Sequence, residues 1–149
     1  MAAHNELGKW GEYKAAEYLR EEKGLYIRHI DWHDKHRDLD IVAIDADMTT
    51  LHVVEVKTRS TKTWGEPDES IDLEKKNNIL KATARYLKLY HLEHLRIQYD
   101  TISVVGTPET SSQITYKEDV FSTLDSYLFY EQKRHQSYYH YRHRPGTWG

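Results

Sequence analysis

Glu55 and Lys57 are the residues whose types and spacing point most directly to chemistry. They lie in the segment 51–58 (LHVVEVKT), whose β-branched, apolar content predicts a strand. Because side chains alternate across a strand, both share one face with Leu51 and Val53. A strand that is apolar on both faces is normally buried, and a buried charge is costly unless it is paired or binds a metal. The pair is therefore either an ion pair near a strand end or part of a reactive site.

A further carboxylate, Asp40, opens the neighbouring segment 39–45 (LDIVAID), which also predicts a buried strand. A short turn separates this segment from 51–58, so the two strands are expected to form a hairpin. The hairpin would place Asp40 and Glu55 near each other at the same end. Two carboxylates held close together repel each other, which raises at least one pKa unless a cation lies between them.

Oxygen ligands of this kind suit Mg²⁺ or Mn²⁺, which keep several waters and bind phosphate. Asp40 and Glu55 are therefore the expected metal ligands, and the main-chain carbonyl of Val56 is a candidate third ligand. Lys57 would then orient or deprotonate a water held by the ion, or neutralise the charge that builds on a phosphate. This pattern favours a hydrolytic site that acts on phosphate esters.

Glu12 is a candidate member of the same site. It lies in the segment 5–23, where apolar residues at three- and four-residue spacing predict a helix. Its neighbours on the helical wheel are small or apolar: Gly8, Ala15, Ala16 and Leu19. Glu12 therefore lies at the edge of the buried face. From the wheel alone, a glutamate that covers the flank of the helix is the simpler interpretation.

The remaining patterns predict one α/β domain over residues 1–131, with a mixed sheet of four or five strands flanked by helices. The expected elements are a helix at 5–23 ended by Gly24, strands at 25–30, 39–45 and 51–58, a helix from an Asp72 cap to about 90, a strand at 96–105, a short strand near 113–116 and a helix near 118–130. Between them, 31–38 is expected to be a polar connection and 59–71 a loop. The residues expected to face inward on the second long helix are Leu73, Leu80, Ala84 and Leu87.

Composition excludes several classes of protein. The chain of 149 residues has no cysteine, which excludes disulfides and thiolate metal sites. No stretch approaches the roughly 20 apolar residues that span a bilayer, and residues 1–6 lack the features of a signal peptide. We therefore expect a cytoplasmic protein that has no membrane partner.

The charge is unevenly distributed along the chain. The net charge is −3, but the window 57–88 holds eight basic and five acidic residues. Residues 132–149 are rich in Arg, His and Tyr without apolar periodicity, and we interpret them as an extended tail. Such a tail could stack on nucleic acid or be a polar, disordered end. A locally basic surface on an acidic molecule is therefore expected.

Other candidate residues carry weaker patterns. Two histidine pairs, His33 with His36 and His91 with His94, have metal-ligand spacing. Neither pair has the carboxylate or cysteine arrangement typical of zinc, so surface histidines are the simpler interpretation. Lys75 and Lys76 open the second long helix, where they could contact phosphates or form a solvated face.

Several motifs together resemble a known family: GKWGEYKAAEYL, RDLDIVAI, LHVVEVKTRS and a basic helix that ends in ATARYL. They resemble the YraN-like bacterial proteins, over about residues 5–105. That family belongs to the PD-(D/E)XK nuclease superfamily and is similar to archaeal Holliday-junction resolvases. The resemblance implies that Asp40 is the acidic residue of the PD position, Glu55 and Lys57 the (D/E)XK pair, and Glu12 the glutamate of the first helix.

Two positions depart from the pattern of that family. Asp38 stands where relatives usually have Glu, which is a conservative change. Gln98-Tyr99-Asp100 stands where relatives usually have Arg-Phe-Asp, so the arginine is lost and Asp100 is kept.

The resemblance implies a restriction-endonuclease-like sandwich and a Mg²⁺- or Mn²⁺-dependent endonuclease that acts on DNA, with branched or flapped DNA as candidate substrates. Arg59, Lys75 and Lys76 are the expected contacts to the nucleic acid, and a homodimer is compatible with the sequence. The main alternative is a nucleic-acid-binding module that has this fold but no hydrolytic activity. An adaptor protein that uses its tail to bind partners is a third.

Overall fold

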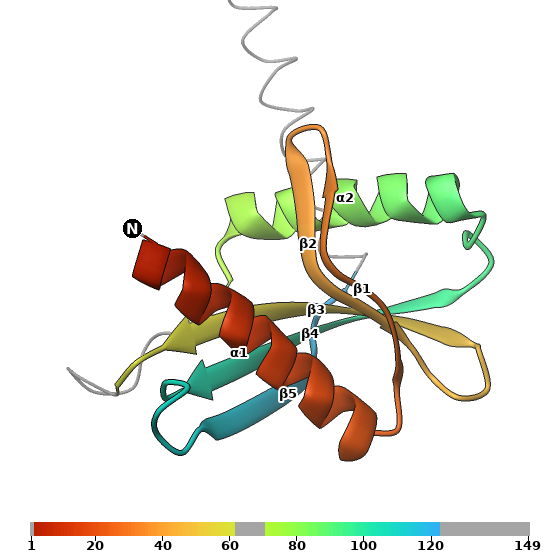
Figure 1. Cartoon of the computed structure of the whole chain (residues 1–149). Coiled ribbons are helices and arrows are strands. Elements are labelled where there is room, and N and C mark those ends of the chain that lie inside the picture. The colour runs from red at the N-terminus through yellow and green to blue at the C-terminus, as the bar shows by residue number, and fades with distance from the viewer. Residues whose placement is uncertain (1, 62–70, 123–149) are drawn as a thin grey trace, which may run out of the picture.

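In the computed structural model, which describes residues 2–61 and 71–122, a five-stranded sheet carries one long helix on each face (Figure 1). The elements are α1 (Ala2–Glu21), β1 (Tyr26–Asp34), β2 (Arg37–Ile44), β3 (Thr50–Arg59), α2 (Leu73–Tyr90), β4 (Arg96–Val105) and β5 (Gln113–Phe121). The strand order is β1-β2-β3-β4-β5, in which β3 and β4 are parallel and the other neighbours antiparallel. The expected α/β architecture with a mixed sheet is therefore confirmed.

The hairpin that carries the candidate site agrees with the sequence prediction. Ile41 faces Val54 and Ile44 faces Leu51 across β2 and β3. Strand β4 also begins and ends at the expected residues, and its parallel pairing with β3 extends over the whole length of both strands. Strands β2 and β3 are thus held in register at the centre of the sheet, where the chemistry-bearing residues lie.

Two expectations about the edges of the sheet are wrong. Residues 31–38 are not a polar connection, because β1 continues to Asp34 and β2 already begins at Arg37. Residues 118–121 are strand rather than the start of a helix, since β5 continues to Phe121. Both errors concern edge strands, whose exposed side chains need no apolar pattern. The rest of the helix expected near 118–130 and the tail 132–149 lie outside the described residues.

Helix α1 lies against the face of the sheet that carries Ile41, Val54 and Ile102. Gly11 allows a close approach to β3, because a Cβ at this position would collide with the Thr58 side chain. The helix is followed by Gly24 in the left-handed conformation (φ 66°), as expected for a residue just beyond a helix end. The close approach at Gly11 places the middle of α1, including Glu12, beside the C-terminal half of β3.

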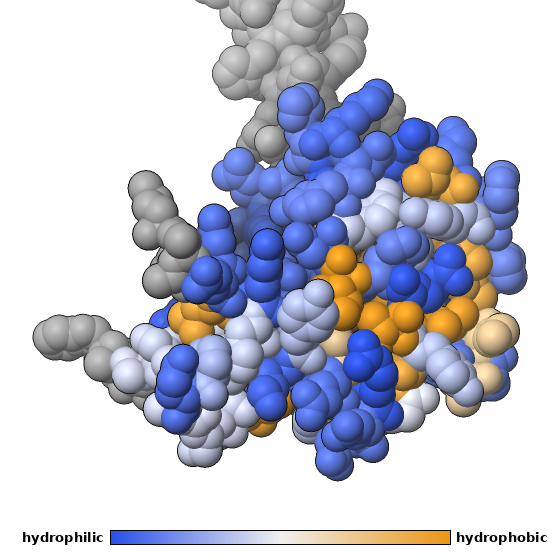
Figure 2. Space-filling view, in the orientation of Figure 1, coloured by the Kyte–Doolittle hydropathy of each residue, from blue (hydrophilic) through white to orange (hydrophobic). Residues whose placement is uncertain are grey.

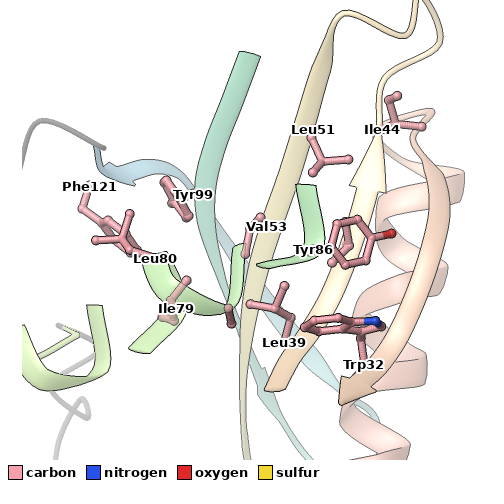
Figure 3. Packing of buried hydrophobic residues seen from close by; sticks show 12 residues of the cluster. Trp32, Leu39, Ile44, Leu51, Val53, Ile79, Leu80, Tyr86, Tyr99 and Phe121 are labelled. Carbon is pink, nitrogen blue, oxygen red and sulfur yellow. The ribbon is translucent and has the colours of Figure 1, made fainter. Parts of the chain in front are cut away.

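Helix α2 covers the opposite face, where Ile79, Leu80 and Tyr86 pack against residues of β2 and β3 (Figure 3). As expected, Asp72 caps this helix, and its carboxylate accepts a hydrogen bond from the Lys75 amide at 2.8 Å. The expected inward face was wrong at Leu73, which is 58% exposed, and at Ala84. The buried side of α2 is instead centred on 79, 83 and 86, so its outer side is free to carry cations.

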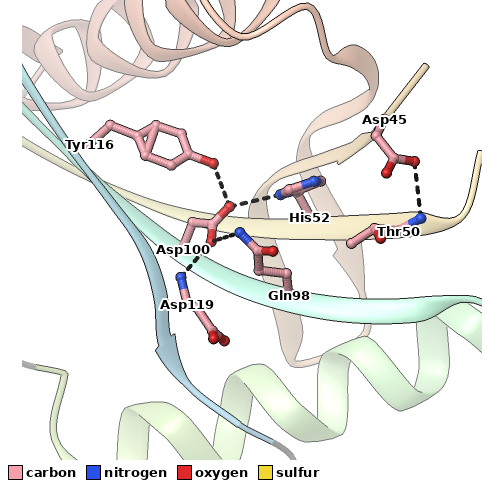
Figure 4. A network of polar contacts seen from close by, with 7 residues as sticks. All are labelled: Asp45, Thr50, His52, Gln98, Asp100, Tyr116 and Asp119. Carbon is pink, nitrogen blue, oxygen red and sulfur yellow. Dashed lines mark hydrogen bonds and ion pairs between the residues drawn. The ribbon is translucent and has the colours of Figure 1, made fainter. Parts of the chain in front are cut away.

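Asp100 is the centre of a buried polar network (Figure 4). One of its oxygens lies 2.9 Å from His52 Nδ1 and accepts a hydrogen bond from the Tyr116 hydroxyl at 2.6 Å. The other accepts from Gln98 Nε2 at 3.0 Å and from the Asp119 amide at 2.9 Å. Burial raises the pKa of Asp100, but these hydrogen bonds outweigh it and hold the pKa below its ordinary value. The network joins β3, β4 and β5.

No helix in the described ranges 2–61 and 71–122 is long and apolar enough to cross a membrane.

We predict that Asp100→Asn destabilises the fold by about 2–4 kcal/mol at neutral pH, because it removes a buried, charged acceptor from four donors. Since the folded pKa of Asp100 is lowered, its contribution is complete above the ordinary aspartate pKa and is lost as the pH falls through the folded pKa. The difference between wild type and variant should therefore shrink below about pH 4. Urea unfolding at several pH values measures this.

The matched control is Asp119→Asn, which changes an exposed carboxylate and leaves its backbone amide in the network. We expect this control to stay within about 0.5 kcal/mol of wild type. Equal urea midpoints for Asp100→Asn and wild type at pH 7 would show that the network does not stabilise the fold.

Candidate active site

A pocket of about 510 Å³ lies between the C-terminal half of β3, the start of α2 and the middle of β4. The residues that line it are Asp40, Glu55, Val56, Lys57, Thr58, Ile71, Asp72, Lys75, Thr101, Ile102 and Ser103. The C-terminal end of β3 and the N-terminal end of α2 meet on this side of the molecule (Figure 1). The pocket thus gathers Asp40, Glu55 and Lys57, which the sequence singled out, in one place.

Asp40 and Glu55 meet where β2 and β3 cease to pair. The regular register ends at Ile41 and Val54, so Asp40 and Glu55 would be the next facing residues. At this point the Asp40 carboxylate, and not a β2 carbonyl, accepts the hydrogen bond of the Val56 amide, at 2.8 Å. The carboxyl groups of Asp40 and Glu55 are also hydrogen-bonded to each other. A carboxyl–carboxylate contact of this kind needs a proton or a cation between the two groups.

The environment makes both carboxyl groups hard to ionise. Burial, followed by repulsion from Asp40, raises the pKa of Glu55 to about 8. Burial also raises the pKa of Asp40, although the hydrogen bonds from Val56 and Glu55 oppose the shift. Near neutral pH and without a cation, the pair therefore holds a proton. A pair of carboxylates in this state gains strongly from a bound cation, because the cation removes the repulsion.

Lys75 supplies part of the missing positive charge. Its Nζ lies 3.4 Å from a Glu55 oxygen, and its side chain is 52% exposed while that of Glu55 is 11% exposed. Burial lowers the pKa of Lys75, but the attraction of Glu55, Asp40 and Asp38 outweighs this and raises it. Within residues 2–61 and 71–122, the ion pair of Glu55 is therefore with Lys75, and not with Lys57 as one reading of the strand suggested.

Lys57 and Val56 occupy the positions in the pocket that the strand pattern implies. Lys57 follows Glu55 by two residues, lines the same pocket and is exposed. Val56 also lines the pocket, and its amide holds Asp40 in place. The ammonium group of Lys57 is therefore available to a ligand that enters beside the two carboxyl groups.

Glu12 approaches the site from α1 and does not line the pocket. Its pKa is raised to about 7, first by burial and then by repulsion from Asp40 and Asp31. Glu12 is therefore within electrostatic range of Asp40. A group with a pKa near 7 can accept or release a proton at neutral pH. Glu12 thus interacts electrostatically with Asp40 of the pair, although the helical wheel alone favoured a glutamate that covers the flank of the helix.

The residues expected to contact nucleic acid lie in different surroundings. Lys75 points to Glu55, as described, whereas the Lys76 ammonium lies 5.6 Å from the centre of the Phe121 ring. Arg59 is half-buried at the end of β3, beyond the residues that line the pocket. Of the three, Lys75 alone lines the carboxylate pocket.

The histidine pairs do not form a metal centre. His33 lies 2.9 Å from Asp31, and His91 caps the end of α2 in the left-handed conformation. In the part of the chain that the structure describes, no group of three or more His, Cys, Asp or Glu side chains surrounds one point. The candidate metal site is therefore the pair Asp40 and Glu55 with the strand backbone.

Sequence reasoning missed Lys75 as the partner of Glu55 and the negative neighbours Asp31 and Asp38. The Asp72 cap did carry a signal, because it places Lys75 in the first turn of α2. Its contact with β3 depends on how α2 lies across the sheet, which periodicity along one segment does not specify.

Comparison with known proteins agrees with the motifs. Residues 11–104 match a family described as Uncharacterised protein family UPF0102. A UPF0102 protein of Bacteroides thetaiotaomicron is 45% identical over 106 residues, which are 71% of this chain and 84% of that protein. One from Phocaeicola vulgatus is 40% identical over 121 residues, 81% of this chain and 96% of that protein. One from Myxococcus xanthus is 37% identical over 111 residues, 74% and 86% of the two chains. The chain belongs to the uncharacterised protein family UPF0102.

Proposed function

We propose that this protein is a metal-dependent endonuclease that hydrolyses phosphodiester bonds in DNA and belongs to the PD-(D/E)XK nuclease superfamily. The observation that carries the proposal is the contact between Asp40 and Glu55 in an open pocket, with the pKa of both groups raised. Two neighbouring, largely desolvated carboxyl groups are unfavourable for folding, and a divalent cation would relieve their repulsion. Branched or flapped DNA remains the candidate substrate.

The residues present fit Mg²⁺ or Mn²⁺. The donors are carboxylate oxygens, with the Val56 carbonyl as a candidate third, and such donor sets suit these two ions. The pocket of about 510 Å³ leaves room for water and a phosphate group beside the carboxyl groups. When bound, the ion would supply Lewis-acid polarisation of the phosphate and activation of the attacking water.

The protein's own residues would divide the remaining work. Asp40 and Glu55 would hold the cation, and the Val56 amide donates a hydrogen bond that orients the Asp40 carboxylate. Lys57 opens into the same pocket and would neutralise the charge that builds on the phosphate in the transition state. Glu12, with a pKa of about 7, would exchange a proton with the site near neutral pH.

Lys75 favours the alternative of a nucleic-acid-binding module without hydrolytic activity. Its ammonium group at 3.4 Å from Glu55 already balances part of the negative charge that a metal would otherwise balance. A cation at Asp40 and Glu55 must compete with this ion pair. The alternative therefore predicts weak metal affinity together with DNA binding. Nuclease activity requires instead that the metal ion displaces Lys75 from Glu55.

We predict that wild type binds one Mn²⁺ ion and that Asp40→Asn loses this binding, because the amide removes one of the two anionic ligands. Calorimetric titration of metal-free protein measures this directly. Asp119→Asn, which changes an exposed carboxylate on β5, is the matched control and should bind as wild type does. Equal Mn²⁺ affinity in wild type and Asp40→Asn would exclude a metal site at this pair.

We predict that Glu55→Gln stabilises the metal-free protein at alkaline pH. The folded pKa of Glu55 is about 8 against an ordinary value of 4.5, so the stability of wild type falls as the pH rises between these values. Glutamine cannot ionise, and its variant should exceed wild type by about 2 kcal/mol above pH 8. Thermal unfolding in EDTA from pH 5 to pH 9 measures the difference. A variant less stable than wild type at pH 9 would contradict the raised pKa.

We predict that Lys57→Ala lowers the rate of DNA cleavage at least about a hundredfold and changes DNA affinity only a few-fold, because Lys57 acts mainly in the transition state. The assay compares linear, flapped and four-way DNA with Mg²⁺, Mn²⁺ or EDTA. Arg20→Ala, which removes an exposed cation from the last turn of α1, is the control and should cut at the wild-type rate.

Unfolding curves for Lys57→Ala must match wild type, so that lost activity reports on the site. If the folded variant cuts as fast as wild type, Lys57 has no role in the reaction. If wild type binds branched DNA but cuts none of the three substrates with either metal, the binding-module alternative is correct.

A further inference from the structure

Beside the carboxylate pocket lies a hollow of about 600 Å³ between the β1–β2 turn and α2. It is lined by Asp34, Lys35, His36, Arg37, Asp38, Lys75, Asn78, Ile79, Lys81 and Arg85. Lys75 belongs to both cavities. A ligand that is long enough can therefore pass from the two carboxyl groups over Lys75 into this hollow.

The hollow continues along α2 into another of about 650 Å³, and Arg37, Lys81 and Arg85 line both. The continuation adds Lys88 and an apolar floor that includes Leu80, Leu87 and Ile97. We call the two hollows together the basic groove. Six basic and two acidic residues line it, on a protein whose net charge is −3. Such a local excess of positive charge attracts a polyanion.

The walls of the basic groove are fixed relative to each other. Arg85 Nε on α2 donates to Asp34 at the end of β1, at 2.7 Å, so that the turn and the helix are held together. Hydrophilic residues cover the end of the molecule where the β1–β2 hairpin stands (Figure 2). The groove thus lies between two elements that an ion pair joins.

Several cations of the groove are available to a ligand. Arg85 pairs with Asp34, and Lys75 with Glu55. Among the described residues, by contrast, no ion pair engages Arg37, Lys81 or Lys88. Like charges that lie near each other without counter-ions repel, and phosphate groups would relieve this repulsion.

We infer that the basic groove binds the sugar–phosphate backbone of a nucleic acid strand that continues from the carboxylate pocket. Cleavage of this strand depends on the proposed function, whereas binding of the strand to the groove does not. From Lys75 to Lys88 the helix covers about 20 Å at about 1.5 Å per residue. At about 3.4 Å per nucleotide this corresponds to about six nucleotides of one strand. The apolar floor contacts sugars or bases while the cations contact phosphates.

The apolar floor and the continuity with the carboxylate pocket favour a nucleic acid strand over an acidic peptide. Lys75 contacts Glu55 and also opens into the groove, so one polymer can occupy both cavities. Near Asp40 and Glu55 the charges act on both kinds of polyanion alike. The floor of Leu80, Leu87 and Ile97 beside the cations suits a strand in which a sugar and a base accompany each phosphate.

The test measures binding of a fluorescein-labelled four-way DNA junction by anisotropy, in EDTA, between about 50 and about 200 mM KCl. Lys81→Ala/Lys88→Ala should weaken binding and flatten the slope of log affinity against log salt by about 2. The loss of affinity over this salt range should then be about tenfold smaller in the double variant than in wild type. Arg20→Ala/Arg96→Ala removes the same charge from exposed positions outside the groove and should keep the wild-type slope.

An unchanged slope and affinity in Lys81→Ala/Lys88→Ala would overturn the inference. So would an equal loss in Arg20→Ala/Arg96→Ala, or displacement of the DNA by polyglutamate at the same concentration of charge. Because EDTA removes the metal, failure of the nuclease proposal has a separate signature. If the protein binds DNA through the groove but never cuts it, this inference stands and the nuclease proposal fails. If Lys81→Ala/Lys88→Ala binds and cuts DNA as wild type does, the nuclease proposal stands and the groove is excluded as the binding site.

Discussion

The contact between the carboxyl groups of Asp40 and Glu55 is the constraint on which the rest of this structure depends. Two buried strands stop pairing at this point, and a side chain takes the hydrogen bond that the ladder would have made. Burial raises the pKa of both groups, and repulsion from Asp40 adds to the rise at Glu55. The arrangement is unfavourable for folding unless a proton or a cation neutralises it. Folded proteins keep such an arrangement where a site needs it, because local strain of this kind concentrates at functional positions. The surrounding helices and strands hold the two carboxyl groups together against their repulsion.

That support comes from both faces of the sheet. Apolar residues of α1 and α2 cover β2 and β3 from opposite sides, so neither strand can shift to separate the carboxyl groups without opening a core. Gly11 brings α1 close to Thr58, which places Glu12 near Asp40 and adds a third carboxyl group to the neighbourhood. The Asp100 network joins β3 to β4 and β5 through hydrogen bonds that favour the ionised carboxylate. Asp100 thus contributes to the scaffold, and Gln98 takes part in the network by donating a hydrogen bond to it.

The sequence was sufficient to predict the central hairpin, β4, both long helices and the meeting of Asp40 with Glu55, because buried strands carry a clear apolar pattern. It was insufficient at β1 and β5, since edge strands expose side chains and resemble loops. It was also insufficient at Leu73 and Ala84, where the way α2 packs on the sheet decides which side is buried. For the same reason the contact between Lys75 and Glu55, and the basic groove beyond it, could not be read from one segment. Both depend on the placement of α2 against residues far away in the sequence.

Lys75 connects the carboxylate pocket to the basic groove. In the metal-free protein its ammonium group balances Glu55, and this ion pair holds the side chain at the boundary between the carboxylate pocket and the basic groove. A divalent cation at Asp40 and Glu55 would take over that charge balance and leave Lys75 free for a phosphate. Metal and polyanion would then bind with positive coupling, because each removes a charge that opposes the other. If Lys75 stays paired with Glu55 in the presence of the metal, Lys75 remains the counter-ion of the pocket. Binding of a polyanion would then depend on the groove alone. Under the proposed function, Lys75 and the divalent cation would therefore compete for the Glu55 carboxylate.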